Sequence, residues 1–165
     1  MSVIDELVEA NKRFADSTGA LAEQPAMPPS RHVAIVTCMD ARIVPAQIFG
    51  LREGDAHVIR NAGGSAREAV RSLVISERLL GTSAVAVIKH TDCGMLTFSN
   101  DDLHAKVQED LGADSSDIDF LPFGDLEQAV REDVELLKSS PLIPDDIEIR
   151  GFIYDVQTRR LSEVS

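Results

Sequence analysis

The sequence alternates short apolar segments with amphipathic segments, and this alternation constrains the fold more than any other feature. Three apolar runs rich in β-branched residues occupy residues 32–37, 56–60 and 83–89, and a fourth occupies 147–156. Short continuous runs of this kind are typical of strands buried on both faces of a parallel sheet. The pattern therefore predicts an α/β fold with a mostly parallel β-sheet flanked by helices.

Helices are predicted between these strands. The clearest covers residues 66–80, where the apolar positions form one stripe. Ser65 and Glu68 make a capping-box pattern at its start, and Gly81 follows it as a C-cap. Further helical patterns are found at 46–51, 101–111 and 125–138, with a loop expected at 112–124 and a turn at 157–160 before a short end piece.

The first 31 residues differ from the rest of the chain. Residues 3–15 have the apolar periodicity and the charge placement of a helix, with acidic residues early and basic residues late. Residues 16–31 have no periodicity and contain three prolines. Because a connection this long is unusual inside a compact domain, we expect an N-terminal helical arm on a tether that packs on a partner subunit.

Length and charge narrow the class of protein. We predict one domain over residues 1–165, with the helix and tether at 1–31 and the core at 32–165. The 28 acidic residues outnumber the 16 basic ones, for a net charge of −12. This balance argues against a nucleic-acid or membrane partner. With no signal peptide and no apolar run of the ~20 residues that span a bilayer, we expect a cytoplasmic protein acting on a small molecule.

Metal-binding residue types follow two of the predicted strands. Cys38 comes directly after the first strand, and His90 and Cys93 come directly after the third. Because ligands of parallel sheets bind beyond the carboxyl ends of the strands, these side chains are expected to meet. Two cysteines and one histidine leave a fourth position open, which is typical of catalytic zinc sites. The spacing therefore favours one Zn²⁺ per subunit.

Other interpretations of the same residues stay open. A disulfide between Cys38 and Cys93 is possible, although a reducing compartment disfavours it. Cys38 could be a buried small hydrophobe with His90 a satisfied polar residue, or one thiolate could be a nucleophile beside His90. A phosphatase-type loop is a poor match, because it needs a longer spacing than that between Cys38 and Arg42.

Asp40 and Arg42 lie close behind Cys38. In an extended segment, alternate residues share a face, so this carboxylate and guanidinium can pair. A surface ion pair of little energetic value is the plainer interpretation. Beside a zinc site with two thiolates, bound water needs help from neighbours. Asp40 could orient a zinc-bound hydroxide or become a fourth zinc ligand, and Arg42 would decide between these by holding Asp40 away.

A glycine-containing turn at residues 60–65 follows the second strand and precedes the capped helix. Glycine permits close backbone approach, and a helix N-terminus favours anions. Tight turn geometry alone would also explain the glycines, and the run does not match the dinucleotide-binding fingerprint. Beside a zinc site it becomes a cradle for a small anion. The substrate-binding candidates are Asn61, Ala62, Gly63, Gly64 and Gly94.

These motifs together resemble those of the β-class carbonic anhydrases. The resemblance extends from about residue 30 to the end, and its carriers are Cys38-x-Asp40-x-Arg42, Arg60-Asn61-Ala62-Gly63, His90-x-x-Cys93 and the fragments 90–95, 138–144 and 150–156. The fragments resemble the small archaeal and actinobacterial members. The chain departs at Arg159, where the family commonly has glycine, a difference expected to touch only turn geometry.

The resemblance implies zinc held by Cys38, His90 and Cys93, with Asp40 and Arg42 as a catalytic dyad. It implies an antiparallel edge strand on the parallel sheet, and a homodimer or homotetramer in which the N-terminal helix reaches the neighbouring subunit. The implied activity is that of a lyase, the reversible hydration of CO₂ to bicarbonate by a zinc-bound hydroxide. Relatives that hydrolyse carbonyl sulfide or carbon disulfide with the same site and release H₂S supply the alternative. A zinc-binding protein without turnover is a third possibility, but it would have no use for the dyad.

Overall fold

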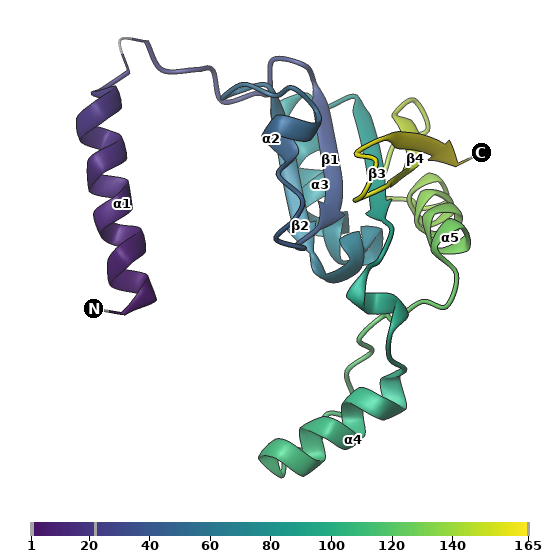
Figure 1. The fold of residues 1–165 in the computed structure, drawn as a ribbon. Helices are drawn as coiled ribbons and strands as arrows, with labels where there is room; N and C mark the ends of the chain where they lie inside the picture. The colour runs from purple at the N-terminus through teal and green to yellow at the C-terminus, as the bar shows by residue number, and fades with distance from the viewer. Residues whose placement is uncertain (1, 22, 165) are drawn as a thin grey trace.

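A five-stranded mixed sheet forms the centre of the computed structural model, which describes residues 2–21 and 23–164 (Figure 1). The strands are β1 (Val33–Cys38), β2 (Ala56–Asn61), β3 (Ala84–His90), β4 (Glu148–Tyr154) and β5 (Leu161–Val164). Their order in the sheet is β2-β1-β3-β4-β5, with parallel pairing throughout except that β5 runs antiparallel to β4. The α/β fold with an antiparallel edge strand is therefore confirmed.

The helices lie close to their predicted positions, and the described chain also has short 3₁₀ turns. They are α1 (Val3–Thr18), α2 (Pro45–Ile48), α3 (Ala66–Leu80), α4 (Asn100–Leu111), α5 (Leu126–Lys138), η1 (Ala62–Gly64) and η2 (Gly94–Leu96). Ser65 caps α3 by accepting from the Glu68 N–H, and Gly81 ends it with a left-handed backbone. The predicted helix at 46–51 was too long: α2 ends at Ile48 because the chain then turns through Gly50, at φ +59°.

Two hydrophobic clusters cover the two faces of the sheet. Alternate residues of a strand point to opposite faces, so Val36 and Val87 join a cluster with Leu73 of α3 and Leu137 of α5. The other face packs through Ile35, Ile88 and Tyr154 against α2 and the loops that follow β1 and β3. Burial on both faces explains why the central strands are continuously apolar in the sequence.

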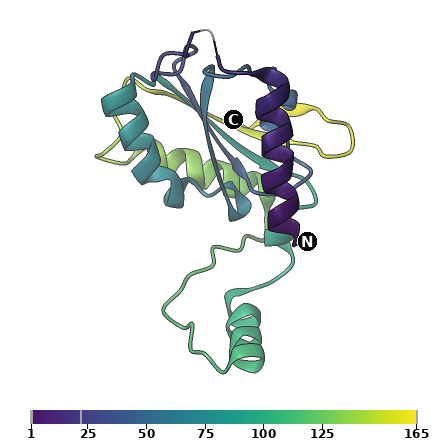
Figure 2. The same cartoon turned by 90° about the vertical axis from the view of Figure 1, so that its left-hand side faces the viewer.

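Helices α1 and α4 stand away from the sheet (Figures 1 and 2). Against the rest of the described chain, α1 buries none of its residues, although it carries Val3, Ile4, Leu7, Val8 and Phe14 with half or more of each side chain exposed. Helix α4 likewise has no buried residue within the described chain. Within residues 2–21 and 23–164, no helix combines the length and apolar character needed to cross a bilayer.

A buried acid in α3 yields the first testable prediction. Glu77 is 5% exposed, and neither carboxylate oxygen has a hydrogen-bond partner among the residues that the structure describes. Burial raises the pKa of Glu77, and the nearby charge of Arg78 only partly opposes this. A buried acceptor without a partner costs about 1–3 kcal/mol. We therefore expect Glu77→Met, which keeps the volume and removes the charge, to stabilise the fold by about that amount near neutral pH.

The sign of the pH dependence follows from the raised pKa. The folded state binds the Glu77 proton more tightly than the unfolded state, so stability from this group falls as pH rises above the unfolded pKa. The gain in Tm from Glu77→Met should accordingly be larger at pH 8 than at about pH 5. Calorimetry of both proteins at the two pH values measures this, and Glu135→Met on α5 is the control for changing a glutamate to methionine. A variant no more stable than the parent at pH 8 would contradict the prediction.

Candidate active site

Cys38, His90 and Cys93 meet at the carboxyl ends of neighbouring strands. Cys38 is the last residue of β1 and His90 the last of β3, so each lies at a strand end where the sequence suggested the first residue beyond it. Cys93 follows in the turn that precedes η2. The sulfur atoms and one ring nitrogen all lie within 4.8 Å of one another, and all three residues are buried. The parallel pairing of β1 with β3 is what brings them together.

The chemistry of this cluster fits a zinc ion. His90 Nδ1 lies 2.8 Å from the Thr91 carbonyl, as expected of a ligating histidine whose other nitrogen donates a hydrogen bond. Its Nε2 is buried and has no hydrogen bond within the described chain, so its lone pair is available. Both cysteines are free, which removes the disulfide interpretation. Two sulfurs and one imidazole nitrogen are a donor set that zinc prefers.

The two cysteine thiols influence each other's pKa. A hydrogen bond from Cys93 lowers the pKa of Cys38, and hydrogen bonds from His90 and from the backbone of Asp40 and Gly63 add to this effect. The interaction with Cys38 raises the pKa of Cys93, burial raises it further, and a backbone hydrogen bond from Met95 opposes the rise. The surroundings of both sulfurs thus include groups that favour a thiolate, the form that binds a metal.

Asp40 and Arg42 form an ion pair next to this cluster. Arg42 Nε lies 2.9 Å from Asp40 Oδ1, and Arg42 Nη2 lies 2.7 Å from Asp40 Oδ2. These hydrogen bonds hold the pKa of Asp40 well below its usual range. Asp40 Oδ2 is also 3.9 Å from His90 Nε2, so the paired carboxylate borders the metal-ligand cluster.

The expected extended geometry of this segment is wrong. Residues 40–43 form a turn, in which the Ile43 N–H donates to the Asp40 carbonyl and the Arg42 N–H donates to Asp40 Oδ1. The pairing of Asp40 with Arg42 thus depends on an aspartate turn closing on itself. A short polar side chain that captures its own backbone competes with extended structure, which explains the difference.

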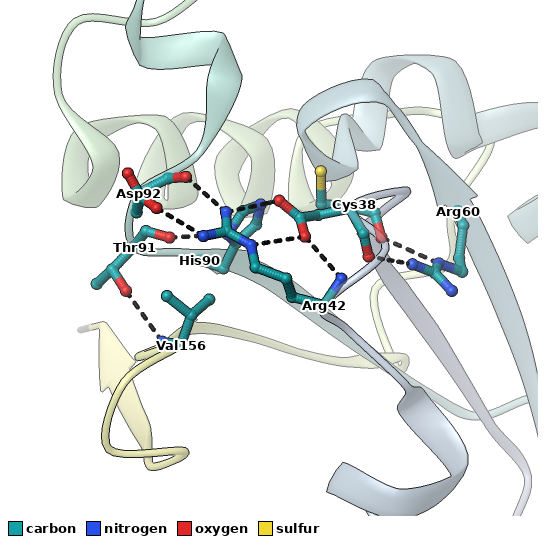
Figure 3. A network of polar contacts seen from close by, with 8 residues as sticks. Cys38, Arg42, Arg60, His90, Thr91, Asp92 and Val156 are labelled. Atoms are coloured by element: carbon teal, nitrogen blue, oxygen red, sulfur yellow. Dashed lines mark hydrogen bonds and ion pairs between the residues drawn. The ribbon is translucent and has the colours of Figure 1, made fainter.

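Asp92 is a site residue whose role was not predicted from the sequence. Arg42 Nη1 donates to Asp92 Oδ2 at 2.6 Å, and Arg42 Nη2 donates to the Asp92 carbonyl at 2.8 Å (Figure 3). Asp92 has φ +55°, a backbone conformation that aspartate tolerates better than most residues. Its position between His90 and Cys93 was the available signal. Asp92 thus fastens Arg42 to the turn that carries Cys93.

Arg60 fastens the other side of the site. Its Nε donates to the Cys38 carbonyl at 3.0 Å, and its Nη2 donates to the Asp40 carbonyl at 2.7 Å (Figure 3). Arg60 belongs to β2, so this strand holds the segment between Cys38 and Asp40 at the end of the neighbouring strand β1. The arginine at the predicted end of the second strand thus has a supporting role at the site.

The predicted cradle is a tightly closed turn. The Asn61 side chain accepts from the Ser65 N–H at 2.6 Å and donates to the Ser65 carbonyl at 2.9 Å, so its amide is engaged within the turn. Gly63 and Gly64 have φ of +71° and +61°. Ala62 packs against the cluster on the face of the sheet that includes Cys38. Gly94 follows Cys93 at the start of η2, with open space where a Cβ would lie among the described atoms.

Similarity to known proteins identifies the family of this chain. The carbonic anhydrase family model matches residues 33–119, more than half of the chain. Over 168 aligned residues, the chain is 40% identical to β-carbonic anhydrase 1 of Mycobacterium tuberculosis, with 100% of this chain and 99% of that protein covered. The chain belongs to the β-carbonic anhydrase family. The resemblance seen in the motifs is thereby confirmed.

Two further relatives show the range of this family. A crystal structure of the carbonic anhydrase from Streptococcus mutans is 52% identical, with a TM-score of 0.94, and the match covers 100% of this chain and 99% of that one. A carbon disulfide hydrolase of an Acidianus species is 34% identical over 184 residues, covering 96% of this chain and 89% of that protein. The family therefore includes proteins named for different small substrates.

The close packing of the turn at Gly64 gives a prediction about the stability of this β-carbonic anhydrase. A Cβ on Gly64 would lie 2.9 Å from the Thr37 carbonyl carbon and 3.0 Å from the Cys38 nitrogen, both in the backbone. We expect Gly64→Ala to destabilise the protein by about 2–5 kcal/mol, from overpacking together with positive-φ strain. Gly112→Ala is the matched control, because its φ is +64° and its Cβ meets open space. Urea denaturation of both variants gives the comparison, and equal losses would contradict the close-contact argument.

Proposed function

We propose that this protein catalyses the reversible hydration of CO₂ to bicarbonate with a zinc ion held by Cys38, His90 and Cys93. The observation that carries the proposal is the buried cluster of these three side chains beside the Asp40–Arg42 pair. Carbonic anhydrases 40% and 52% identical to this chain support the same activity. A protein that only binds zinc would have no use for a charged pair held against the ligand cluster.

The residues around the cluster have separable tasks. When bound, zinc supplies the Lewis acidity that lets water act as a nucleophile near neutral pH. Asp40 accepts a hydrogen bond from the reacting water and orients it toward CO₂, which requires the carboxylate to stay ionised. The hydrogen bonds from Arg42 keep it ionised by lowering its pKa. Asp92 holds Arg42 in place, so the orientation of Asp40 depends on both loops.

In this proposal Arg42 also holds Asp40 away from the metal. Asp40 lies close enough to the ligand cluster to become a fourth ligand, since its Oδ2 is 3.9 Å from His90 Nε2. Both Asp40 oxygens accept from Arg42 instead. We propose that this bidentate pairing keeps Asp40 out of the ligand set. We propose that Asn61, Ala62, Gly63 and Gly64, together with Gly94, form the small-anion cradle.

The hydrolysis of carbonyl sulfide or carbon disulfide is the second candidate function, favoured by the 34% identical carbon disulfide hydrolase. The test compares zinc-loaded protein in two assays at mildly alkaline pH, namely CO₂ hydration by indicator stopped flow and H₂S release from each sulfur substrate. Fast hydration with slow H₂S release supports the carbonic anhydrase. Weak hydration with efficient H₂S release reassigns the substrate, and activity in neither assay overturns both functions.

We propose a homodimer or homotetramer in which α1 packs on a partner copy. The core at 32–165 would be one domain, with residues 1–31 as the arm of a chain spanning 1–165. Helix α1 supports this, because it exposes an apolar face that includes Leu7 and Phe14, at 61% and 64%. An apolar helix face is stable when it is buried against another surface.

Negative charge on the apolar face of α1 should break the proposed assembly. The double variant Leu7→Glu, Phe14→Glu is expected to shift the protein to a smaller species in light scattering after size exclusion. Arg13→Glu, on the polar side of α1, should leave the mass unchanged. An assembly that survives the double variant would contradict the role of the arm.

We further propose a cytoplasmic location and a small-molecule substrate as the partner. Both cysteines are free and buried, in keeping with a reducing compartment. The net charge of −12 speaks against binding to nucleic acid or to anionic membranes. Fractionation of the native cells, followed by detection of this chain, tests the location.

A further inference from the structure

Lys89 is an unusual residue for the centre of a sheet. It precedes His90 in β3 and is 3% exposed, whereas lysine is almost never fully buried without partners. Its Nζ lies 2.8 Å from Asp133 Oδ2, 3.1 Å from the Gly63 carbonyl and 3.4 Å from the Gly64 carbonyl. The ring of Phe123 lies beneath it, with its centroid 4.9 Å away. The three donors of the ammonium therefore each have an acceptor.

Asp133 holds this ammonium from α5. Its Oδ2 also accepts from the N–H of Ala66, the first residue of α3, at 3.0 Å. One carboxylate oxygen thus joins α5, the start of α3 and the end of β3. Asp133 thereby keeps the Lys89 ammonium in contact with the carbonyls of the Gly63–Gly64 turn.

That turn connects Lys89 to a proposed metal ligand. Lys89 donates to the carbonyls of Gly63 and Gly64, which lie on either side of the Gly64 Cα. Gly64 lies against the backbone of Thr37 and Cys38, with no room for a Cβ. The ammonium therefore limits the movement of this turn relative to the end of β1. The turn is therefore fixed by Lys89 on one side and contacts Cys38 on the other.

We propose that Lys89 is a positioning residue for Cys38: it fixes the Gly63–Gly64 turn that packs against the Cys38 backbone, and so holds this cysteine in place beside His90 and Cys93. This inference rests on the proposed Cys38–His90–Cys93 site. A purely structural role, in which Lys89 only attaches α5 through Asp133, is the competing explanation.

The experiment uses the full chain loaded with Co²⁺ or Zn²⁺. Thiolate-to-cobalt charge-transfer absorption reports on the sulfurs, competition with a chromophoric chelator gives zinc affinity, and calorimetry gives Tm. We expect Lys89→Met to weaken zinc binding by about 10–100-fold, as losses of groups that orient metal ligands do, and to shift the charge-transfer band. The exposed Lys106→Met should change neither.

A second variant separates positioning from stability. Lys89→Met alone leaves Asp133 unpaired, so the double variant Lys89→Met, Asp133→Asn removes both charges and keeps an acceptor for Ala66. We expect the double variant to recover Tm while zinc affinity and the band stay altered. Parental affinity and band in the double variant would overturn the positioning role. Parent protein without any thiolate-to-cobalt band would instead overturn the ligand set, and with it the proposed function.

Discussion

Cys38→Ser or Cys93→Ser is expected to abolish zinc binding and all measurable CO₂ hydration. A serine hydroxyl stays protonated near neutral pH and is a poor zinc donor, whereas a thiolate is among the best. Either change leaves two ligands of the three. Metal content by elemental analysis and hydration by stopped flow measure the two losses.

The fold itself should survive these substitutions. Both cysteines are buried, and serine is slightly smaller than cysteine, so it fits either position without overpacking. Met39→Ser, at the exposed residue next to Cys38, is the matched control and should keep full zinc occupancy. Full occupancy in either cysteine variant, with Tm unchanged, would show that the ligand assignment is incorrect.

Asp40→Asn should keep zinc but slow hydration by about 100-fold or more, in the range for removal of a positioned acid–base group. The amide has the size of the carboxylate but loses its charge and one of its two acceptor oxygens. It can no longer take both hydrogen bonds from Arg42 and orient water at the same time. Values of kcat/KM at saturating zinc, together with metal content, separate this loss from loss of the metal.

Asp92→Asn is the matched control for Asp40→Asn. It removes the other carboxylate that binds Arg42 but keeps the Asp92 carbonyl, which also accepts from Arg42. The Asp92 side chain is largely exposed, so its loss should cost less than about tenfold in kcat/KM. If Asp40→Asn stays near the parental rate, Asp40 is not the orienting acceptor. If the two variants lose equally, the effect belongs to Arg42.

Much of the fold follows from local signals in the sequence. The capped helix predicted at 66–80 has those bounds in the structure, because Ser65 and Gly81 satisfy its end groups with neighbouring residues. Strand β5 had no such local signal: the residue pattern predicted a short end piece, and only the family resemblance implied an antiparallel edge strand. Its four residues are mostly exposed and become a strand by pairing with β4. Arg159, in the turn before it, has φ +60°, a backbone conformation that glycine adopts more readily than arginine.

For the site, the donor set could be predicted from the residue types and spacing of Cys38, His90 and Cys93, because strand ends place neighbours predictably. The support around these residues became clear in the folded structure. The turn that pairs Asp40 with Arg42 is local, whereas the contact of Asp92 with Arg42 and the burial of Lys89 against Asp133 join segments far apart in the chain. Hydrogen bonds of this kind are set by packing geometry, and packing geometry has no local pattern in a sequence.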